Sequence, residues 1–227
     1  MKKKITLVFF TLLAICTLNV KAQEESSWST GVDLYNTYVW RGTKFGSGPS
    51  LQPTVKYSNS GFTIGAWGAY SFSNSAFTVS EGTEVDAYME ADLWASYGFE
   101  LGEKSSLTFT VTDYFFPSST SEYFDGSQHY VEPMVSLGLG SFSLTGAYMT
   151  NVNDMYLEAG LAVGAVSLFA GAGDGQYTKD ASFNVCNLGI KTSKEIKISD
   201  SFSIPITGAV IMNPSTEKFH IVVGITL

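Results

Sequence analysis

The sequence has little charge, few cysteines and a single arginine. Of its 227 residues 15% are charged, and the formal net charge is −8. Globular domains carry about 25% charged residues, whereas 44% of this chain is hydrophobic, which is too apolar for a disordered protein. Nucleic acid binding needs clusters of Lys and Arg, so the acidic balance excludes nucleic acid as a partner.

The scarcity of cysteine and histidine limits covalent and metal chemistry. Cys16 lies in an N-terminal segment that we expect to be removed, which leaves Cys186 alone and without an internal disulfide partner. Lipid attachment at Cys16 is disfavoured because Ile15 precedes it, where a small residue is expected. His129 and His220 are too few for a zinc site built from Cys and His. We expect no metal and no cofactor.

No uninterrupted apolar run reaches the ~20 residues that a transmembrane helix needs. The run from Ile5 to Leu18 follows Lys2–Lys4 and precedes Val20–Ala22, where small residues occupy the positions that a signal peptidase recognises. This pattern predicts a cleaved signal peptide, residues 1–22, and a single exported domain, residues 23–227. The mature chain would have 9 Lys and Arg against 21 Asp and Glu, a net charge of −12.

Alternation of apolar and polar residues with a period of two dominates the mature chain, which is typical of β-strands. From Glu84 to Phe99 one face is uncharged and the other is acidic, a run much longer than the usual ~5–6 residues of a soluble strand. The alternation predicts twelve strands, at about 28–41, 50–58, 62–72, 84–99, 106–116, 128–139, 142–150, 155–164, 166–173, 183–192, 202–212 and 218–227.

Short turns and longer loops alternate between the predicted strands. Turns at 59–61, 140–141 and 164–165 are tight, whereas the segments 42–49, 73–83, 117–127 and 174–182 are longer and rich in Ser, Gly, Asp and Thr. An up-and-down meander whose two ends face different compartments has this pattern. We therefore predict an all-β fold, a transmembrane antiparallel β-barrel of about twelve strands.

Aromatic residues gather at both ends of the predicted apolar faces, as they do at the two surfaces of a membrane. The predicted aromatic girdle consists of Trp28, Tyr57, Phe62, Tyr97, Phe99 and Phe142 at the turn end, with Tyr38, Trp40, Tyr70 and Tyr148 at the loop end. Such belts predict contact with outer-membrane lipids and location in the bacterial outer membrane. Asn36 and Asp113 fall on the same outward face and interrupt its apolar pattern.

The C-terminal strand alternates to its last residue, with Phe219, Ile221, Val223, Ile225 and Leu227 on one face. A final strand that ends in a hydrophobic residue resembles the signal for the outer-membrane barrel assembly machinery. We expect that machinery to be a partner.

Several segments resemble the TorF-type porin family. Tyr38-Val-Trp-Arg-Gly42, Gly48-Pro-Ser-Leu-Gln-Pro53 and Ser60-Gly-Phe-Thr-Ile-Gly-Ala-Trp67 are similar to its opening strands, and Tyr114-Phe-Phe-Pro117 and Tyr156-Leu-Glu-Ala-Gly160 to later ones. The match is good over residues 29–70 and patchy beyond. The resemblance implies a small outer-membrane barrel with a channel role, and it supplies no substrate.

Charged residues of the inward phase would line the barrel. These pore-lining candidates are Asp33, Arg41, Lys56, Glu84, Asp86, Glu90, Asp92, Glu132, Glu158, Lys191, Lys218 and His220. Acids outnumber permanent cations, so a conducting lumen should favour cations. Internal ion pairs that hold a closed barrel are the alternative. Arg41 is expected to pair with Glu84 or Asp86 on a neighbouring strand, or with loop carbonyls at the rim.

Three functions remain open at this stage. The first is a porin-like channel for small solutes, and the second is a non-conducting structural or adhesion barrel that acts through its extracellular loops. The third is a secreted soluble β-barrel that binds an apolar ligand. We expect no enzyme, because Ser127 and His129 lie two residues apart on one predicted strand and form no nucleophile–base pair.

Overall fold

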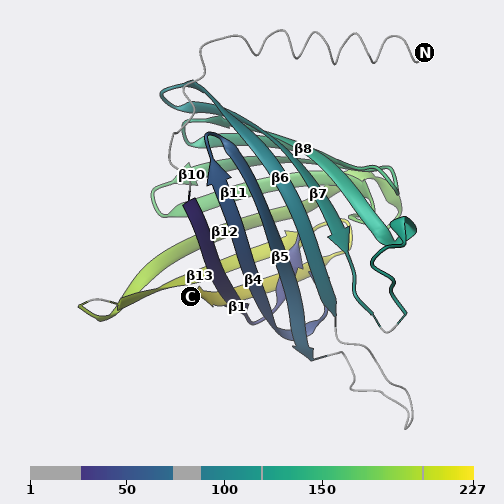
Figure 1. The fold of residues 1–227 in the computed structure, drawn as a ribbon, viewed down its shortest axis with the longest axis horizontal. Helices are drawn as coiled ribbons and strands as arrows, with labels where there is room; N and C mark the ends of the chain where they lie inside the picture. Colours follow the sequence, from purple (N-terminus) through teal and green to yellow (C-terminus); the bar gives the residue numbers. More distant parts are fainter. Residues whose placement is uncertain (1–26, 74–87, 119, 201) are drawn as a thin grey trace.

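Twelve antiparallel strands close into one barrel, in the order β1-β14-β13-β12-β11-β10-β9-β8-β7-β6-β5-β4 (Figure 1). The computed structural model describes residues 27–73, 88–118, 120–200 and 202–227, so the predicted signal peptide, residues 1–22, lies outside the described residues. The wall strands are β1 (Ser27–Tyr35), β4 (Ser47–Asn59), β5 (Phe62–Ser73), β6 (Met89–Gly102), β7 (Ser105–Phe115), β8 (His129–Leu139), β9 (Phe142–Met149), β10 (Asp154–Val163), β11 (Val166–Gly175), β12 (Ala181–Ser199), β13 (Phe202–Asn213) and β14 (Lys218–Thr226). The predicted fold class is confirmed.

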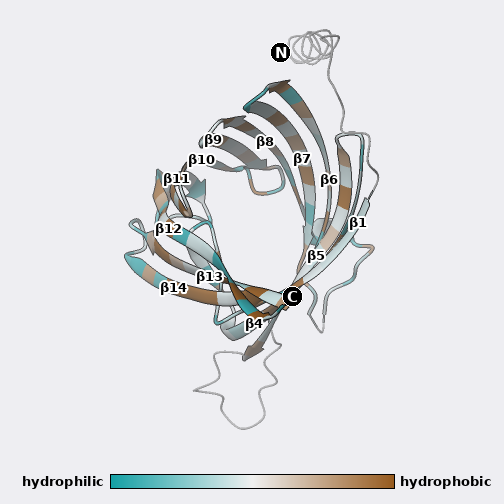
Figure 2. Cartoon of the chain, turned by 90° about the vertical axis from the view of Figure 1, so that its left-hand side faces the viewer, coloured by the Kyte–Doolittle hydropathy of each residue, from teal (hydrophilic) through white to brown (hydrophobic). Residues whose placement is uncertain are grey.

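Side chains alternate between the two faces of the wall, so apolar and polar residues alternate along each strand (Figure 2). On β6 the outward Leu93 is 50% exposed, whereas the inward Glu90 and Asp92 are 6% and 7% exposed. A water-soluble barrel buries its apolar face. Here the apolar face is the outer one, which is the arrangement of a barrel surrounded by lipid.

The two rims of the barrel differ in their connections. At one end, called the turn rim, β4–β5, β8–β9 and β10–β11 are joined by two-residue turns, and both ends of the wall, Ser27 and Thr226, lie there. The other end, called the loop rim, carries the longer connections, including the β7–β8 loop with a short 3₁₀ helix at Gly126–Gln128. No helix among the described residues is long and apolar enough to span a membrane.

Eight residues of the predicted aromatic girdle lie on the outer face. Trp28, Phe62, Tyr97 and Phe142 are exposed near the turn rim, and Tyr70 and Tyr148 near the loop rim. Tyr57 packs on Trp28 at 5.2 Å between ring centroids, and Phe99 on Tyr97 at 4.7 Å. These rings form one belt at each end of an aliphatic band.

The prediction of one continuous strand over 28–41 is wrong. β1 ends at Tyr35, and the chain then turns into the barrel as a hairpin of β2 (Tyr38–Trp40) and β3 (Thr43–Phe45). We call the segment Asn36–Gly46 the inner hairpin. The girdle prediction is therefore wrong for Tyr38 and Trp40, because both belong to this hairpin and not to the wall; Tyr38 is only 8% exposed.

Asn36 marks the point where the chain leaves the wall. Its side-chain nitrogen donates to the carbonyl of Ile221 at 3.0 Å, and its side-chain oxygen accepts from the amide of Val223 at 2.8 Å. The side chain thus replaces the backbone partner that β14 loses when β1 ends. This explains a polar residue on the outward face, since an unpaired backbone group in lipid costs several kcal/mol.

The second outward polar residue, Asp113, is also satisfied locally. Its carboxylate lies 2.9 Å from Nδ1 of His129, and the His129 ring stacks on Phe115 with 5.1 Å between centroids. Tyr123 from the β7–β8 loop packs on the same Phe115 ring at 5.2 Å. The loop therefore covers this polar pair on the outside of the wall at the loop rim.

β12 continues seven residues beyond the predicted end at Thr192. Residues 193–199 pair with the start of β13, as in Lys197 opposite Ser203, and this extension projects past the turn rim (Figure 1, yellow-green). Lys194, Glu195 and Lys197 give the segment the composition of a loop. The segment nevertheless forms a strand, because β13 follows it after a short connection and pairs with it.

Candidate functional site

The inner hairpin crosses the barrel and is fastened to the opposite wall by its single arginine. Arg41 donates from Nη1 to Oε2 of Glu132 at 2.6 Å and from Nη2 to Oε1 at 2.9 Å. Nη1 also donates to the Tyr177 hydroxyl at 2.7 Å. The hairpin leaves the wall between β1 and β4, and Glu132 lies on β8, so the four strands β4 to β7 separate the two along the shorter way round the barrel. The observed partner is Glu132, and Glu84 and Asp86, the predicted partners of Arg41, lie outside the described residues.

Aromatic rings enclose the Arg41–Glu132 pair. The guanidinium carbon lies 4.4 Å from the centroid of the Trp40 ring and 4.3 Å from that of Tyr156. The side chains of Arg41 and Glu132 are 8% and 2% exposed. The bidentate geometry and the ring faces suit a guanidinium, which stays charged in proteins and stacks on aromatic rings. A lysine could not make the same contacts.

Gly42, next to Arg41, lets the tip of the hairpin approach the wall at β12 and β13. Its φ is +79°, and a Cβ atom there would collide with the carbonyl oxygen of Cys186 and lie 3.3 Å from Cβ of Asn213. The neighbouring wall is itself ordered by a hydrogen bond from the Asn213 side chain to the carbonyl of Tyr177 at 3.0 Å. Only glycine fits this position.

Gly42→Ala is expected to lower the free energy of unfolding by about 2–4 kcal/mol, because it adds a collision to the strain of a left-handed backbone. Gly164→Ala is the matched control: its φ is +61° and no atom lies within 4 Å of the added Cβ, so only about 1–2 kcal/mol should be lost. Urea unfolding in detergent, followed by tryptophan fluorescence, measures both. Equal losses of unfolding free energy in the two variants would contradict close packing of the hairpin tip against the wall.

On its other side the inner hairpin packs against wall strand β5 and against Tyr88, the residue before β6. The Tyr38 ring lies 5.4 Å from Trp67 and 6.1 Å from Tyr88, and Phe45 lies 5.5 Å from Tyr88. The hairpin is thus held by ring contacts on one side and by the Arg41–Glu132 pair on the other. Two cavities among the described residues are lined in part by this hairpin.

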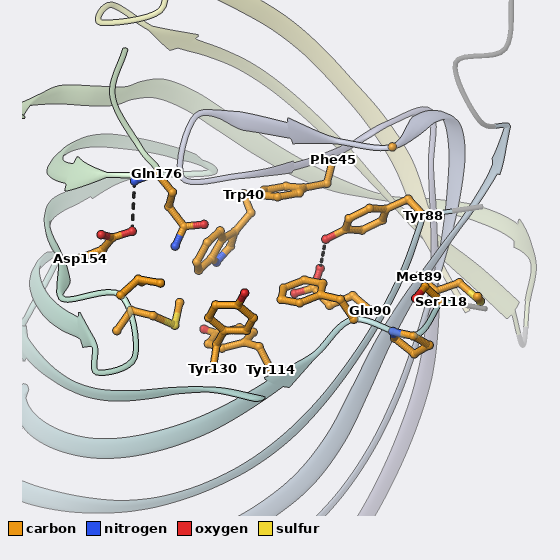
Figure 3. Close-up of a pocket in the computed structure, with 15 residues that line it drawn as sticks. Trp40, Phe45, Tyr88, Met89, Glu90, Tyr114, Ser118, Tyr130, Asp154 and Gln176 are labelled. Atoms are coloured by element: carbon orange, nitrogen blue, oxygen red, sulfur yellow. Dashed lines mark hydrogen bonds between the residues drawn. The ribbon is translucent and has the colours of Figure 1, made fainter. Parts of the chain in front are cut away.

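The larger cavity, called the cup, opens at the loop rim and has a volume of about 700 Å³. Trp40 and Phe45 of the inner hairpin lie on one side, and Tyr114 and Tyr130 of the wall lie opposite (Figure 3). Tyr88 and Glu90 close one end, and Asp154 and Gln176 the other. None of the described residues that line the cup is basic.

Two carboxylates near the cup lack a cationic partner. Glu90 accepts a hydrogen bond from the Tyr88 hydroxyl at 2.6 Å, and Oδ1 of Asp92 is buried with no hydrogen-bond partner. Neither takes part in the ion pairs found among the described residues. Buried acids without a counter-charge are costly, so this part of the wall is not optimised for stability alone. By contrast, Asp154 accepts from the backbone of Gln176 at 3.1 Å.

The smaller cavity, about 280 Å³, lies under the inner hairpin toward the turn rim. It is lined by Asp33 and Lys191 among others. Glu158, also inward, accepts hydrogen bonds from Tyr156 and, at 2.8 Å, from Asn187. Lys56 and Lys218 have the inward register of their strands and are exposed, and His220 lies against the backbone of Gly42. Glu84 and Asp86 lie outside the described residues.

Acidic residues also occur in the described loops of the loop rim. Asp125 accepts hydrogen bonds from the backbone and hydroxyl of Ser127, which lower its pKa, and Ser182 does the same for Asp180. Both carboxylates are therefore ionised near neutral pH and attract cations to this rim. No group of three or more His, Cys, Asp and Glu suited to a metal ion occurs in the described part of the chain.

Sequence reasoning missed several rings of the site, above all Tyr130, Tyr156 and Tyr177. The inward register could be predicted for the two that lie on strands, but Tyr177 belongs to the β11–β12 turn, for which alternation gives no signal. The inner hairpin was the largest omission, because its Trp40 ring packs on Tyr114 and Tyr177, each at 5.6 Å between ring centroids.

A family model described as "Bacterial protein of unknown function (Gcw_chp)" matches residues 20–200. The chain belongs to this family. No curated protein matches it. The match to the Gcw_chp family does not confirm the TorF-type resemblance, and the description of the Gcw_chp family assigns it no function. The barrel and its bacterial origin are thus established, and the role of the cup and the inner hairpin has to be argued from their geometry.

Proposed function

We propose that the protein is an outer-membrane barrel that passes small solutes, and that the inner hairpin is its gate. The observation that carries the proposal is the position of this hairpin: it crosses the lumen between a cup open at one rim and a smaller cavity toward the other. An exposed apolar outer face with aromatic belts supports the membrane location. Export through the signal peptide would place the loop rim outside the cell.

The charges along the inner face support a preference for cations. Glu90 and Asp92 stand at the level of the cup and hairpin without a cationic partner among the described residues, and Glu158 lies below. A purely structural plug would pair these groups, as Arg41 pairs Glu132. Carboxylates along a narrow path lower the energy of a passing cation and raise that of an anion.

Planar bilayers test the proposal with the purified barrel. Under a salt gradient we expect discrete conductance steps and a reversal potential on the cation-selective side. The double variant Glu90→Gln/Asp92→Asn should lower the ratio of cation to anion permeability by about twofold or more. Asp125→Asn, on an exposed loop, is the control and should change it little. A folded barrel without conductance would reject the channel and favour the non-conducting barrel, whose hairpin is a permanent plug.

A further inference from the structure

The cup combines features that select one chemical class of ligand. Its volume of about 700 Å³ lies within the range of sites for small organic molecules. Six of its lining residues are aromatic, namely Trp40, Phe45, Tyr88, Tyr114, Phe116 and Tyr130. Ring faces are electron-rich and attract cations that carry apolar groups, such as substituted ammonium ions.

Glu90 supplies a charge for such a cation. The residue is 6% exposed, lines the cup, and accepts hydrogen bonds from the hydroxyls of Tyr88 and Tyr38. Asp92, two residues further on the same face, has a buried oxygen with no partner. An ammonium group near Glu90 would supply this buried carboxyl with the counter-charge that no ion pair among the described residues provides.

Other ligand classes fit the cup less well. An organic anion would meet Glu90 and Asp154 with no basic lining residue to balance them. A bare metal ion needs several oxygen ligands, and Asp154 is already engaged by the backbone of Gln176. A sugar would bury many hydroxyl groups beside a lining whose uncharged polar groups, apart from tyrosine hydroxyls, are the Trp40 indole N–H and the side chains of Ser118 and Gln176.

We propose that the cup binds an organic cation, whose ammonium group meets the Glu90 carboxylate and whose apolar body contacts the aromatic side chains. This proposal deepens the proposed function by naming a class of solute. It rests on the proposed function only for the orientation of the cup toward the outside of the cell. The inner hairpin forms one side of the cup through Trp40 and Phe45, so a ligand in the cup touches the gate directly.

Calorimetric titration of the detergent-solubilised barrel tests the proposal without measuring any conductance, so either proposal can fail alone. The probes are benzyltrimethylammonium, neutral benzyl alcohol and anionic benzoate. We expect the cation to bind at least about tenfold more tightly than the other two. Glu90→Gln should remove most of that difference, and Tyr130→Leu should weaken cation binding about fivefold.

Glu195→Gln is the matched control, because Glu195 is an exposed carboxylate on the projecting part of β12, far from the cup. It should leave all three affinities unchanged. Heat-modifiable migration on gels checks that each variant is folded. Equal binding of the three probes, no binding of the cation to a folded barrel, or undiminished cation binding by Glu90→Gln would each overturn the proposal.

Discussion

Replacing Glu132 with alanine is expected to release the inner hairpin. The change leaves the Arg41 guanidinium in a site where both partners of the pair were almost fully buried, 8% and 2% exposed. Removing one partner of a buried ion pair typically costs about 3–5 kcal/mol, because the other charge remains without compensation. The hairpin can avoid this cost by withdrawing toward the loop rim, where Arg41 regains water.

Cys186 reports this movement. It is fully buried in a cluster with Tyr156 and Tyr177, against which Trp40 of the hairpin packs, and it is the one cysteine of the predicted mature chain. A buried thiol reacts slowly, so maleimide labelling of the folded barrel should be slow. In Glu132→Ala the labelling rate should rise about 100-fold or more, which corresponds to the loss of at least ~3 kcal/mol.

In this experiment a double variant separates the effect of an unpaired buried charge from the effect of lost side-chain packing. Arg41→Met/Glu132→Leu removes both charges and keeps apolar volume, and such replacements of buried pairs are often neutral or stabilising. Slow labelling should return in this variant. Protection of Cys186 that persists in a folded Glu132→Ala barrel would mean that the aromatic contacts alone hold the hairpin.

Deleting the inner hairpin is expected to have the largest effect on permeability. Residues 37–46 can be replaced by a short Gly-Ser turn because the wall does not depend on them: β1 and β4 pair directly from Ser27 opposite Ser58 to Tyr35 opposite Ser50. Without the crossing segment the cup and the lower cavity become continuous. Single-channel conductance should rise on the order of tenfold, since a narrow constriction dominates the resistance of a pore.

The same deletion should also strengthen cation selectivity, because it removes Arg41 and leaves Glu132 without its counter-charge. Tyr123→Ala is the control, since Tyr123 lies in the β7–β8 loop, packs on the outer wall against Phe115 and does not line the cup. That change should leave conductance as it is. An unchanged conductance in a folded barrel without the hairpin would place the constriction elsewhere.

Local alternation was sufficient for most of the wall. β9, predicted at 142–150 and observed at Phe142–Met149, has apolar residues at every second position and a glycine-containing turn before it. β12 was predicted too short, because Lys194, Glu195 and Lys197 interrupt the apolar pattern where the strand leaves the barrel. The alternation of apolar and polar residues reflects the environment on the two faces of a strand. Beyond the turn rim that environment changes, although the backbone pairing of β12 with β13 continues.

The candidate site was largely beyond the reach of sequence reasoning. Tyr38 and Trp40 continue the phase of Val32 and Leu34, so a ring that packs inside the barrel has the same local signature as a ring that faces lipid. The partner of Arg41 lies 91 residues away in the chain, and only the closed strand order brings the two together. The inward register of Glu90 and Asp92 was predictable, and their lack of a cation was not.

The contacts of the inner hairpin also fix when it can be seated during assembly. The hairpin follows the first wall strand, yet its tip binds Glu132 and Tyr177, which are 91 and 136 residues further along the chain. Such distant contacts form late, because long stretches of chain must be ordered first. β1 meets β14 only when the last strand has been made. We therefore expect the interior of an incomplete barrel to be open. The inner hairpin would cross the lumen only after the barrel has closed.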